Sequence, residues 1–358
     1  MPCARGEAGR TLALHPGVHL RPSVVVFLSL SACAGAEPGS TDTAGETGDA
    51  APVDADGDGA PAWTGVGDAA RADCDDTDPD VNPDTEVLVP TGSFLQGQDG
   101  ERWAEPAREV ELSTYCVDRF EVTHDAFLRF LEHQEARGSS NTDDLGLGLY
   151  SLDDAVSPDV YPSAYAYDDG VWTLDPLYAG HPVTEVWEHS GEAYCAWLGK
   201  RLPTEAEWEK AARGTDGATW PWGEAPPGCE RAAFARVEPS TGIDAELCYP
   251  LTVEVDALLD NVSVYGAVGM AGNVSEWVAD WFSPTAYSEA GAVDPTGPDG
   301  PVEFDDGVGR YVACVARGGN WAQGAARLRT FDRWPEPEWA TSNGIGFRCA
   351  RPLRDATP

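Results

Sequence analysis

The densest group of chemically useful side chains is a pair of aspartate runs in the first quarter of the chain. The first run alternates carboxylates with small residues, and the second surrounds a cysteine. Like charges at this density repel strongly unless a cation neutralises them. Because carboxylate oxygens are the ligands that calcium prefers, we expect a structural Ca²⁺ site here. Its candidate ligands are Asp54, Asp56, Asp58, Asp73, Asp75, Asp76 and Asp78.

The spacing of the first run resembles the start of an EF-hand loop, D-x-D-G-D-G. The twelfth position of such a loop would be Gly65 rather than glutamate, so an EF-hand is not expected. The pair of runs is similar to thrombospondin type 3 calcium repeats, in which a second aspartate cluster completes the ligand shell. The alternative is a solvated acidic spacer, because residues 34–86 contain 15 acids and one base and have almost nothing to bury. We expect 34–86 to be an acidic linker that carries the calcium motif.

A cysteine follows a short apolar run near the N-terminus. The run VVVFLSLSA ends at Ala32, follows Arg21 and is too short to span a bilayer, which is typical of a secretory signal. Leu-Ser-Ala-Cys33 resembles the bacterial lipobox, in which cleavage leaves a lipidated cysteine. We therefore expect 1–33 to be a signal peptide and the protein to be exported and lipid-anchored to the bacterial cell envelope, at the outer membrane or in the periplasm. An ordinary secretory signal with a chance cysteine is the alternative.

The charge balance limits the partners. With 61 acids against 23 lysines and arginines, the net charge is −38. Such a surface repels nucleic acid and anionic membranes. We expect no nucleic-acid partner, membrane contact only through the lipid anchor, and a protein, peptide or glycan ligand at the envelope.

Regular structure is expected to be sparse after about Pro90. Alternating apolar residues predict a strand over 109–118. Three helices are expected, with caps or stops at their ends. The first is capped by Thr123 and buries Phe127, Phe130 and Leu131. The second covers 188–198 and has Ala193, Ala196 and Trp197 on one face. The third begins with a capping box at Thr204 and ends at Gly214.

Short motifs follow one another in order through this part of the chain. They are T-G-S-F-L-Q-G from Thr91, E-V-T from Glu121, H-P-V from His181, A-Y-C from Ala193, K-R-L-P-T-E-A-E-W-E from Lys200, W-P-W-G from Trp220, G-N-V-S-E-W from Gly272, R-G-G-N-W from Arg317 and G-F-R-C from Gly346. Any one of them is weak, but the ordered set is specific. It resembles the formylglycine-generating enzyme, or sulfatase-modifying factor, family. The resemblance implies an irregular, loop-rich, C-type-lectin-like α+β fold with little regular secondary structure for residues 87–358.

The resemblance implies a copper oxidase, but the residues required for that chemistry are missing. The family oxidises a cysteine of a sulfatase peptide with copper(I) held by two thiolates a few residues after R-G-G, and soft sulfur ligands suit this ion. Gln323 and Leu328 occupy those two positions. A second catalytic branch uses clustered histidines, whereas the six histidines here are scattered, and His124 and His189 are expected to be capping or core residues. We therefore expect no copper, and these residues indicate no assembled redox site.

A second cation site is implied at the G-N-V-S-E-W motif. The family holds calcium there, which assigns a carboxylate to Glu276 and backbone carbonyls to Gly272 and Val274. Gly269 stands where the family places an acid or amide, so one ligand is lost. The other interpretation of Glu276 is a buried acceptor for backbone amides.

Nine cysteines in an exported chain predict disulfides. Cys195 and Cys349 lie in the motifs that a disulfide joins in animal members of the family. Cys229 and Cys248 bracket a long loop. Cys116 and Cys314 are the other two expected in disulfides, which leaves Cys74 over, and connectivity beyond the first pair stays open.

Three functions remain open. The chain is a non-catalytic ligand-binding module, an oxidase with a diverged site that modifies a protein side chain, or a structural part of an envelope machine. Aromatic and arginine side chains anchor binding surfaces, although core and salt-bridge roles are equally open for each residue. The candidate ligand-binding residues are Trp321, Gln323, Arg327, Arg329, Asp332, Arg333 and Trp334.

Overall fold

The computed structural model describes the chain from residue 56 onward, with gaps. The described residues are 56–58, 60, 72–75, 78–139, 141–142, 146–152, 163–236 and 246–353. They belong to one compact unit, Ala51–Pro358. The expected signal peptide with Cys33, and the candidate calcium ligands Asp54 and Asp76, lie outside the described residues.

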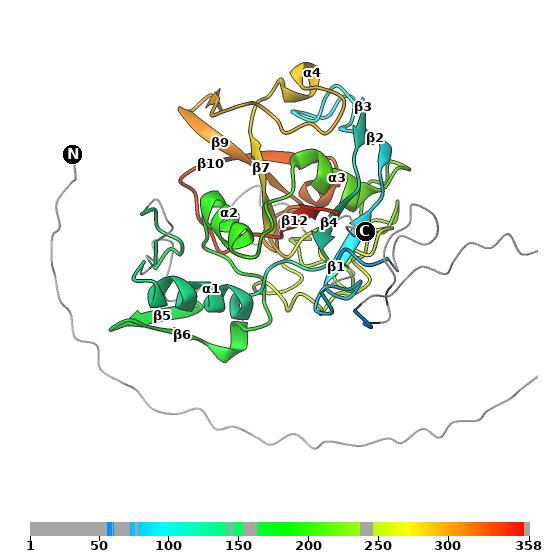
Figure 1. The fold of residues 1–358 in the computed structure, drawn as a ribbon. Helices are drawn as coiled ribbons and strands as arrows, with labels where there is room; N and C mark the ends of the chain where they lie inside the picture. Colours follow the sequence, from blue (N-terminus) through cyan, green and yellow to red (C-terminus); the bar gives the residue numbers. More distant parts are fainter. Residues whose placement is uncertain are drawn as a thin grey trace, which may run out of the picture. The chain divides into compact units, whose positions relative to one another are not determined.

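Four small sheets carry the fold of the described residues (Figure 1). The largest orders β10 (Arg333–Pro337), β9 (Arg310–Arg317), β7 (Ser275–Trp281) and β11 (Ile345–Phe347), and β8 (Glu303–Asp305) also pairs with β9. Only β11 runs parallel to its partner, β7. A second sheet orders β1 (Glu86–Val89), β4 (Tyr115–Asp118) and β12 (Ala350–Pro352). Two hairpins complete the set: β2 (Gly92–Gln96) with β3 (Arg108–Leu112), and β5 (Tyr165–Asp168) with β6 (Val171–Leu174).

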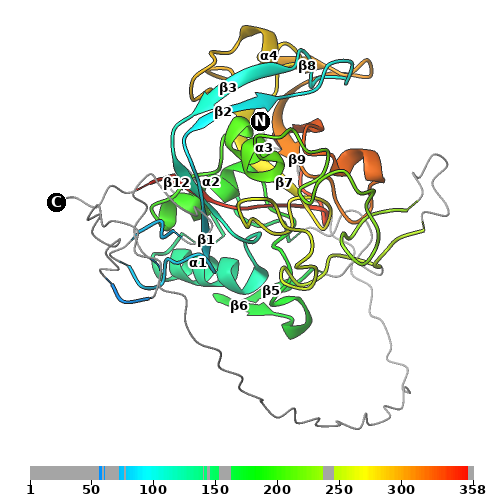
Figure 2. The same cartoon turned by 90° about the vertical axis from the view of Figure 1, so that its right-hand side faces the viewer.

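The helices are short. They are α1 (His124–Ala136), α2 (Glu188–Trp197), α3 (Glu205–Arg213) and α4 (Ala286–Glu289), with 3₁₀ turns at Pro176–Tyr178 and Ala325–Leu328. In Figure 2 α3 lies near the β2–β3 hairpin while α1 lies near the β5–β6 hairpin. Helix α1 lies beside strand β6. None of the helices in the described part of the chain is long and apolar enough to cross a bilayer. The expected loop-rich α+β architecture with little regular structure is confirmed.

Local signals set the helix ends as expected. Thr123 caps α1 by accepting the backbone N–H of Ala126. Thr204 and Glu207 form the capping box of α3, which ends at Gly214 with φ +70°. The expected buried residues of α1, Phe127, Phe130 and Leu131, are buried.

Two details differ from the expectation. The strand predicted over 109–118 is two strands, because β3 pairs with β2 whereas β4 pairs with β1 and β12. On α2 the buried residues are Ser190, Gly191, Tyr194 and Cys195, and Trp197 stays 37 % exposed. The small residue at Gly191 permits this close packing, because a Cβ there would lie 3.1 Å from Leu202 and Phe347.

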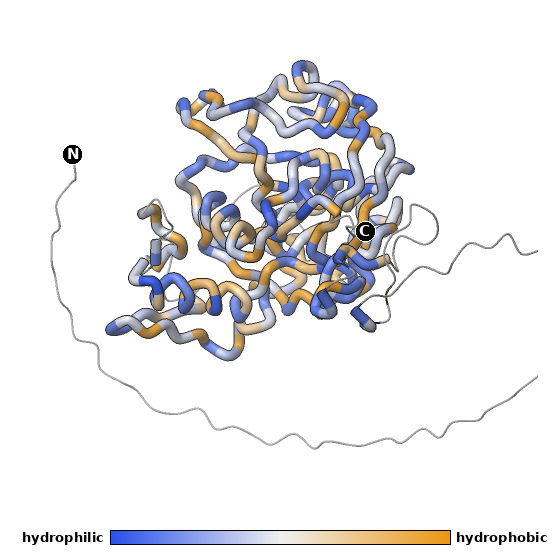
Figure 3. Tube along the Cα trace, in the orientation of Figure 1, coloured by the Kyte–Doolittle hydropathy of each residue, from blue (hydrophilic) through white to orange (hydrophobic). Residues whose placement is uncertain are grey.

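Two main hydrophobic clusters fill the interior, and Figure 3 shows apolar segments running through the interior of the trace. One gathers α1, α2 and the β5–β6 hairpin around Trp277 and Phe347. The other gathers α3 with residues of β1 to β4, β7 and β9 around Trp208. Helix α3 is buried along its whole length, charged residues included. The interior must therefore neutralise charge as well as exclude water.

Three disulfides join the described residues. Cys195 bonds to Cys349, the pair that the family resemblance implied, and Cys229 bonds to Cys248. Cys116 bonds to Cys74, the cysteine expected to be left over. The expectation of a disulfide at Cys314 is wrong, because this thiol is free and buried in β9.

Candidate functional site

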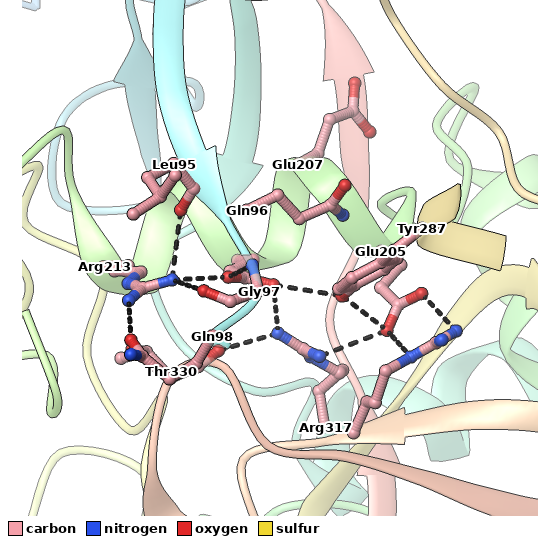
Figure 4. A network of polar contacts seen from close by, with 12 residues as sticks. Leu95, Gln96, Gly97, Gln98, Glu205, Glu207, Arg213, Tyr287, Arg317 and Thr330 are labelled. Carbon is pink, nitrogen blue, oxygen red and sulfur yellow. Dashed lines mark hydrogen bonds and ion pairs between the residues drawn. The ribbon is translucent and has the colours of Figure 1, made fainter. Parts of the chain in front are cut away.

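The most heavily charged part of the interior surrounds α3 (Figure 4). We call it the arginine cluster, formed by Glu205, Glu209, Arg213, Arg317 and Arg333. Their side chains are at most 3 % exposed. They come from α3, the end of β9 and the start of β10. Motif residues far apart in the sequence therefore meet at one point.

Glu205 accepts hydrogen bonds from two arginines. Nε and Nη2 of Arg333 donate to its two oxygens, at 2.7 Å each, in a bidentate pair. Nη1 of Arg317 donates to the same carboxylate at 3.1 Å. The backbone N–H of Glu205 donates to Asp280, and burial raises the pKa of that aspartate to about 8.

Glu209 links the other arginines to the opening motif of the domain. It accepts from Arg213 at 3.0 Å, from Arg317 at 2.8 Å and from the backbone N–H of Gly97 at 2.7 Å. Gly97 has φ +80°, and a Cβ there would lie 2.3 Å from the carbonyl oxygen of Ala104. The glycine that closes T-G-S-F-L-Q-G is therefore required for backbone contact with the cluster.

Tyr287 also belongs to this network. Tyr287 donates to Glu205 at 3.3 Å and to Glu209 at 3.2 Å, and burial raises the pKa of its hydroxyl well above the usual range. Burial alone would lower the pKa of Arg317, but Tyr287 and the two glutamates raise it above its ordinary value. These ion pairs hold α3, β9 and β10 together, while Nε of Arg213 and Nε of Arg317 are buried without a hydrogen bond to any described residue.

A second buried pair occupies the expected calcium site. Both oxygens of Glu276 accept from Arg348, at 2.7 Å each, and one also accepts from Trp208 Nε1 at 2.9 Å. Glu276 is thus a buried acceptor, for side chains rather than for the backbone amides that we considered. With a guanidinium already bound to this carboxylate, the side chain does not fit a role as calcium ligand. Gly272 and Val274 lie beside it in the turn before β7.

The positions of the family's two thiolates differ in their surroundings. Leu328 is fully buried and packs in an apolar cluster with Ala232, Phe234 and Ala271. Gln323 is half-buried, and its backbone carbonyl accepts from Ala235. Neither residue fits copper(I), which requires soft sulfur ligands.

The remaining cysteines do not supply that missing pair. Cys349 is held in a disulfide, so it offers no thiolate. Burial raises the pKa of the Cys314 thiol far above neutrality, so this sulfur stays protonated. The described part of the chain therefore has no dithiolate copper site.

The candidate ligand-binding residues do not form one exposed face. Arg333 is buried in the arginine cluster, and Trp321 is 3 % exposed and donates through Nε1 to the carbonyl of Asn343. These two are core residues, the other role that we left open for them. The rest lie nearer the surface: Arg327 stacks 3.6 Å over Trp334 and pairs with Asp332, while Arg329 pairs with Glu101.

Some carboxylates of the two aspartate runs lie close together. One carboxylate oxygen each from Asp56, Asp58 and Asp73 lie within 4.8 Å of one another. Asp75 is instead buried in an ion pair with Arg351, 3.1 Å away, and Asp78 is exposed. Sequence spacing alone could not separate the converging aspartates from the paired one.

Sequence reasoning missed the charges of α3. Arg213 and Tyr287 were not predicted to be functional or structural residues. A signal was present, because this nine-residue helix carries two glutamates, a lysine and an arginine besides its capping box.

Comparison with known proteins identifies the family. Residues 73–353 match the sulfatase-modifying factor enzyme 1-like domain, so the chain belongs to this family. It is 33 % identical over 291 residues to the formylglycine-generating enzyme of Thermomonospora curvata, covering 74 % of this chain and 92 % of that protein. It is 30 % identical over 301 residues to the mouse protein named inactive C-alpha-formylglycine-generating enzyme 2, covering 75 % and 87 %.

Other similarities define the fold and the extent of the match. The structure of PvdO from Pseudomonas aeruginosa superposes with a TM-score of 0.53 at 23 % identity, over 75 % of this chain and 94 % of that one. The serine/threonine-protein kinase Pkn1 of Chlamydia trachomatis is 33 % identical over 270 residues, which cover 75 % of this chain but only 38 % of the kinase. Relatives named as a formylglycine-generating enzyme and as an inactive one are about equally similar, so overall similarity does not decide activity.

The arginine cluster yields a stability prediction. Glu209→Gln leaves Arg213 and Arg317 without their shared carboxylate, and breaking such a buried pair costs about 3–5 kcal/mol. Denaturant unfolding should detect a loss of this size. The matched control is Asp305→Asn, which breaks the exposed pair with Arg310 and should cost less than about 1 kcal/mol. Equal effects of the two substitutions would contradict the central role of the cluster.

Proposed function

We propose that the chain is a non-catalytic member of the family that acts as a ligand-binding or scaffolding module at the cell envelope. The observation that carries the proposal is Leu328, which fills a thiolate position with a fully buried hydrocarbon side chain. Gln323 at the other position is no better as a copper ligand. The alternative, an oxidase with a diverged site, would require redox groups that these two positions do not provide.

The family motifs that are present in this chain support a separation between the fold and the oxidase activity. The arginine cluster and the Glu276–Arg348 pair use the motif residues, and both are internal ion pairs. Conservation of the scaffold therefore does not require conservation of the oxidase. Surface residues around Arg327, Arg329 and Trp334 then remain for a partner, since aromatic and guanidinium groups are favoured in binding surfaces.

The first test is turnover. Purified protein loaded with copper and incubated with a C-x-P-x-R peptide should produce no formylglycine above the copper-only control, as measured by mass spectrometry. An active family member provides the positive control, and Gln323→Cys with Leu328→Cys tests whether the scaffold can be restored. Formylglycine from the unaltered protein above the copper-only rate would overturn the proposal and favour the oxidase.

A calcium site at the aspartate runs is proposed as a structural accessory. One oxygen of each aspartate accepts a backbone N–H two residues on: Asp56 from Asp58, Asp58 from Ala60 and Asp73 from Asp75. These turns fix the carboxylates from two runs so that they converge. Hard carboxylate oxygens in this arrangement suit Ca²⁺.

Calcium titration of the full chain tests this site. Calcium should raise the unfolding free energy of the wild type, by about 2.7 kcal/mol at 100 times the dissociation constant. Asp56→Asn with Asp58→Asn should remove the effect. Asp168→Asn with Asp169→Asn, which alters two acids in the β5–β6 turn, is the charge-matched control. Equal stabilisation of both variants would leave the segment as a charged spacer.

Export and lipid anchoring through Cys33 are also proposed, on the lipobox sequence. Cys33→Ala should move the protein from the membrane fraction to the soluble fraction of a bacterial host, whereas Cys3→Ala should not. A Cys33→Ala protein that stays in the membrane fraction, beside wild type without lipid by mass spectrometry, would refute the anchor.

A further inference from the structure

A cavity of about 320 Å³ lies beside the first turn of α3. Its volume is within the range of about 300–1,000 Å³ that small-molecule sites occupy. Glu207 belongs to its lining, and in Figure 4 the carboxylate of this residue points away from the arginine cluster. None of the functions discussed above uses this cavity.

The walls of the cavity are mostly apolar and are held by backbone and side-chain contacts. Tyr115 pairs with Pro352 between β4 and β12, and its hydroxyl donates to the carbonyl of Glu207 at 2.6 Å. The backbone N–H of Ala279 donates to the carbonyl of Pro203. Walls fixed in this way can receive an apolar group without reorganising. The apolar lining residues are Leu112, Tyr115, Ala279, Pro295 and Pro352.

Arg201 is the cation among the lining residues, and one edge of its guanidinium is unused. Nη1 and Nη2 each donate to one oxygen of Glu207 at 2.6 Å, and Nη1 also donates to the carbonyl of Leu202 at 3.0 Å. A guanidinium has five N–H donors. Nε–H and the second hydrogen of Nη2 remain, and no described residue accepts from either.

This unused edge has the geometry of an acceptor site for a planar ligand. Nε–H and Nη2–H of a guanidinium lie side by side and can bind a carboxylate through two parallel hydrogen bonds. The side chain of Arg201 is 42 % exposed, so a ligand from solvent can contact it.

The two acids of the lining already have donors within the protein. Besides Arg201, Glu207 accepts the backbone N–H of Thr204 at 2.8 Å. Asp294 accepts the backbone N–H of Ser113 with one oxygen and the Ser113 hydroxyl with the other, at 2.7 Å each. Because Asp294 is exposed, water and salt screen its charge.

Two hydroxyls of the lining add further donors. The Thr204 hydroxyl oxygen accepts the backbone N–H of Glu207, and the Thr114 hydroxyl oxygen accepts that of Thr91. Each hydroxyl still has its own hydrogen to donate. The unused hydrogen-bonding capacity of the cavity therefore consists mainly of donors, which select a ligand that accepts.

We propose that this cavity binds a carboxylate attached to an apolar group, the chemistry shared by a small organic acid and the C-terminal residue of a peptide. The carboxylate pairs with the unused edge of Arg201, and the apolar group fills the space between the apolar walls. A guanidinium shared by two carboxylates has a precedent in this protein, because Arg317 pairs with both Glu205 and Glu209. The inference rests on the proposed binding function and names its ligand class.

Binding to the full chain is measured by calorimetry and NMR, at about 0.15 M salt to screen the distant surface acids. The probes are hydrocinnamate and acetyl-Gly-Phe with a free carboxylate, and the controls are the neutral amides of both. At least one acid should bind, and its amide should bind at least about tenfold more weakly because it cannot form the charge-assisted pair. Binding of hydrocinnamate without the peptide, or the reverse, identifies the source.

Matched variants locate the site. Arg201→Lys keeps a positive charge beside Glu207 but removes the unused edge, so it should weaken binding of the acid by about tenfold or more. Arg310→Lys, in the exposed pair with Asp305, should not.

A second variant tests the cavity without altering the ion pair. Ala279→Phe adds a ring to the wall and should also weaken binding, whereas Ala196→Phe at an exposed position of α2 should not. The test therefore survives if one of the two cavity variants fails to fold.

Three results would overturn the proposal: no binding of either acid by the folded wild type, equal affinity for an acid and its amide, or equal affinity of Arg201→Lys and Arg310→Lys for the acid. These results are independent of the formylglycine assay. A non-catalytic module without a carboxylate site therefore stays distinguishable from an active oxidase.

Discussion

The fold depends on the ion pairs that three buried arginines make with two glutamates of α3. Withdrawing these charges from water costs several kcal/mol each unless every partner is in place. Arg317 and Glu205 are 112 residues apart, and Arg333 and Glu205 are 128 apart. The cluster therefore forms only when β2, α3, β9 and β10 have all reached their positions. The described residues form little regular secondary structure, so few backbone hydrogen bonds between strands hold the fold in one arrangement. The pairing of these buried charges specifies the arrangement instead.

The need to pair these buried charges also explains how a member of the family can keep the fold without the two copper-binding cysteines. The motif residues Glu205, Glu276 and Arg317 belong to internal ion pairs, so any loss at these positions would leave a buried charge unpaired. The positions of the two thiolates lie outside these pairs. A leucine at 328 adds to an apolar cluster and disturbs none of them. Family membership, which the sequence match establishes, thus constrains the interior and leaves the reaction free to be lost.

Sequence reasoning succeeded where the determining interaction is local. The ends of α1 and α3 follow from Thr123, Thr204 and Gly214, whose hydrogen bonds stay within a turn of the helix. It failed where a distant partner decides. Whether 109–118 is one strand or two depends on which strands lie alongside, and the buried side of α2 depends on Phe347. The number and positions of the cysteines could not predict the partner of Cys116 either, because Cys74 lies in an acidic segment whose composition is typical of a linker.

The segment around Cys74 is held to the domain by ion pairs as well as by the disulfide. Arg351 pairs with both Asp75 and Glu86, and Lys200 pairs with Glu86 and Asp118. Asp73, which directly precedes Cys74, is therefore positioned by the domain itself. Asp56 and Asp58 reach the same point from an earlier segment and have no comparable tie to the core among the described contacts. A cation shared by the three carboxylates would consequently join that earlier segment to the folded domain, and its removal would release the segment without disturbing the arginine cluster.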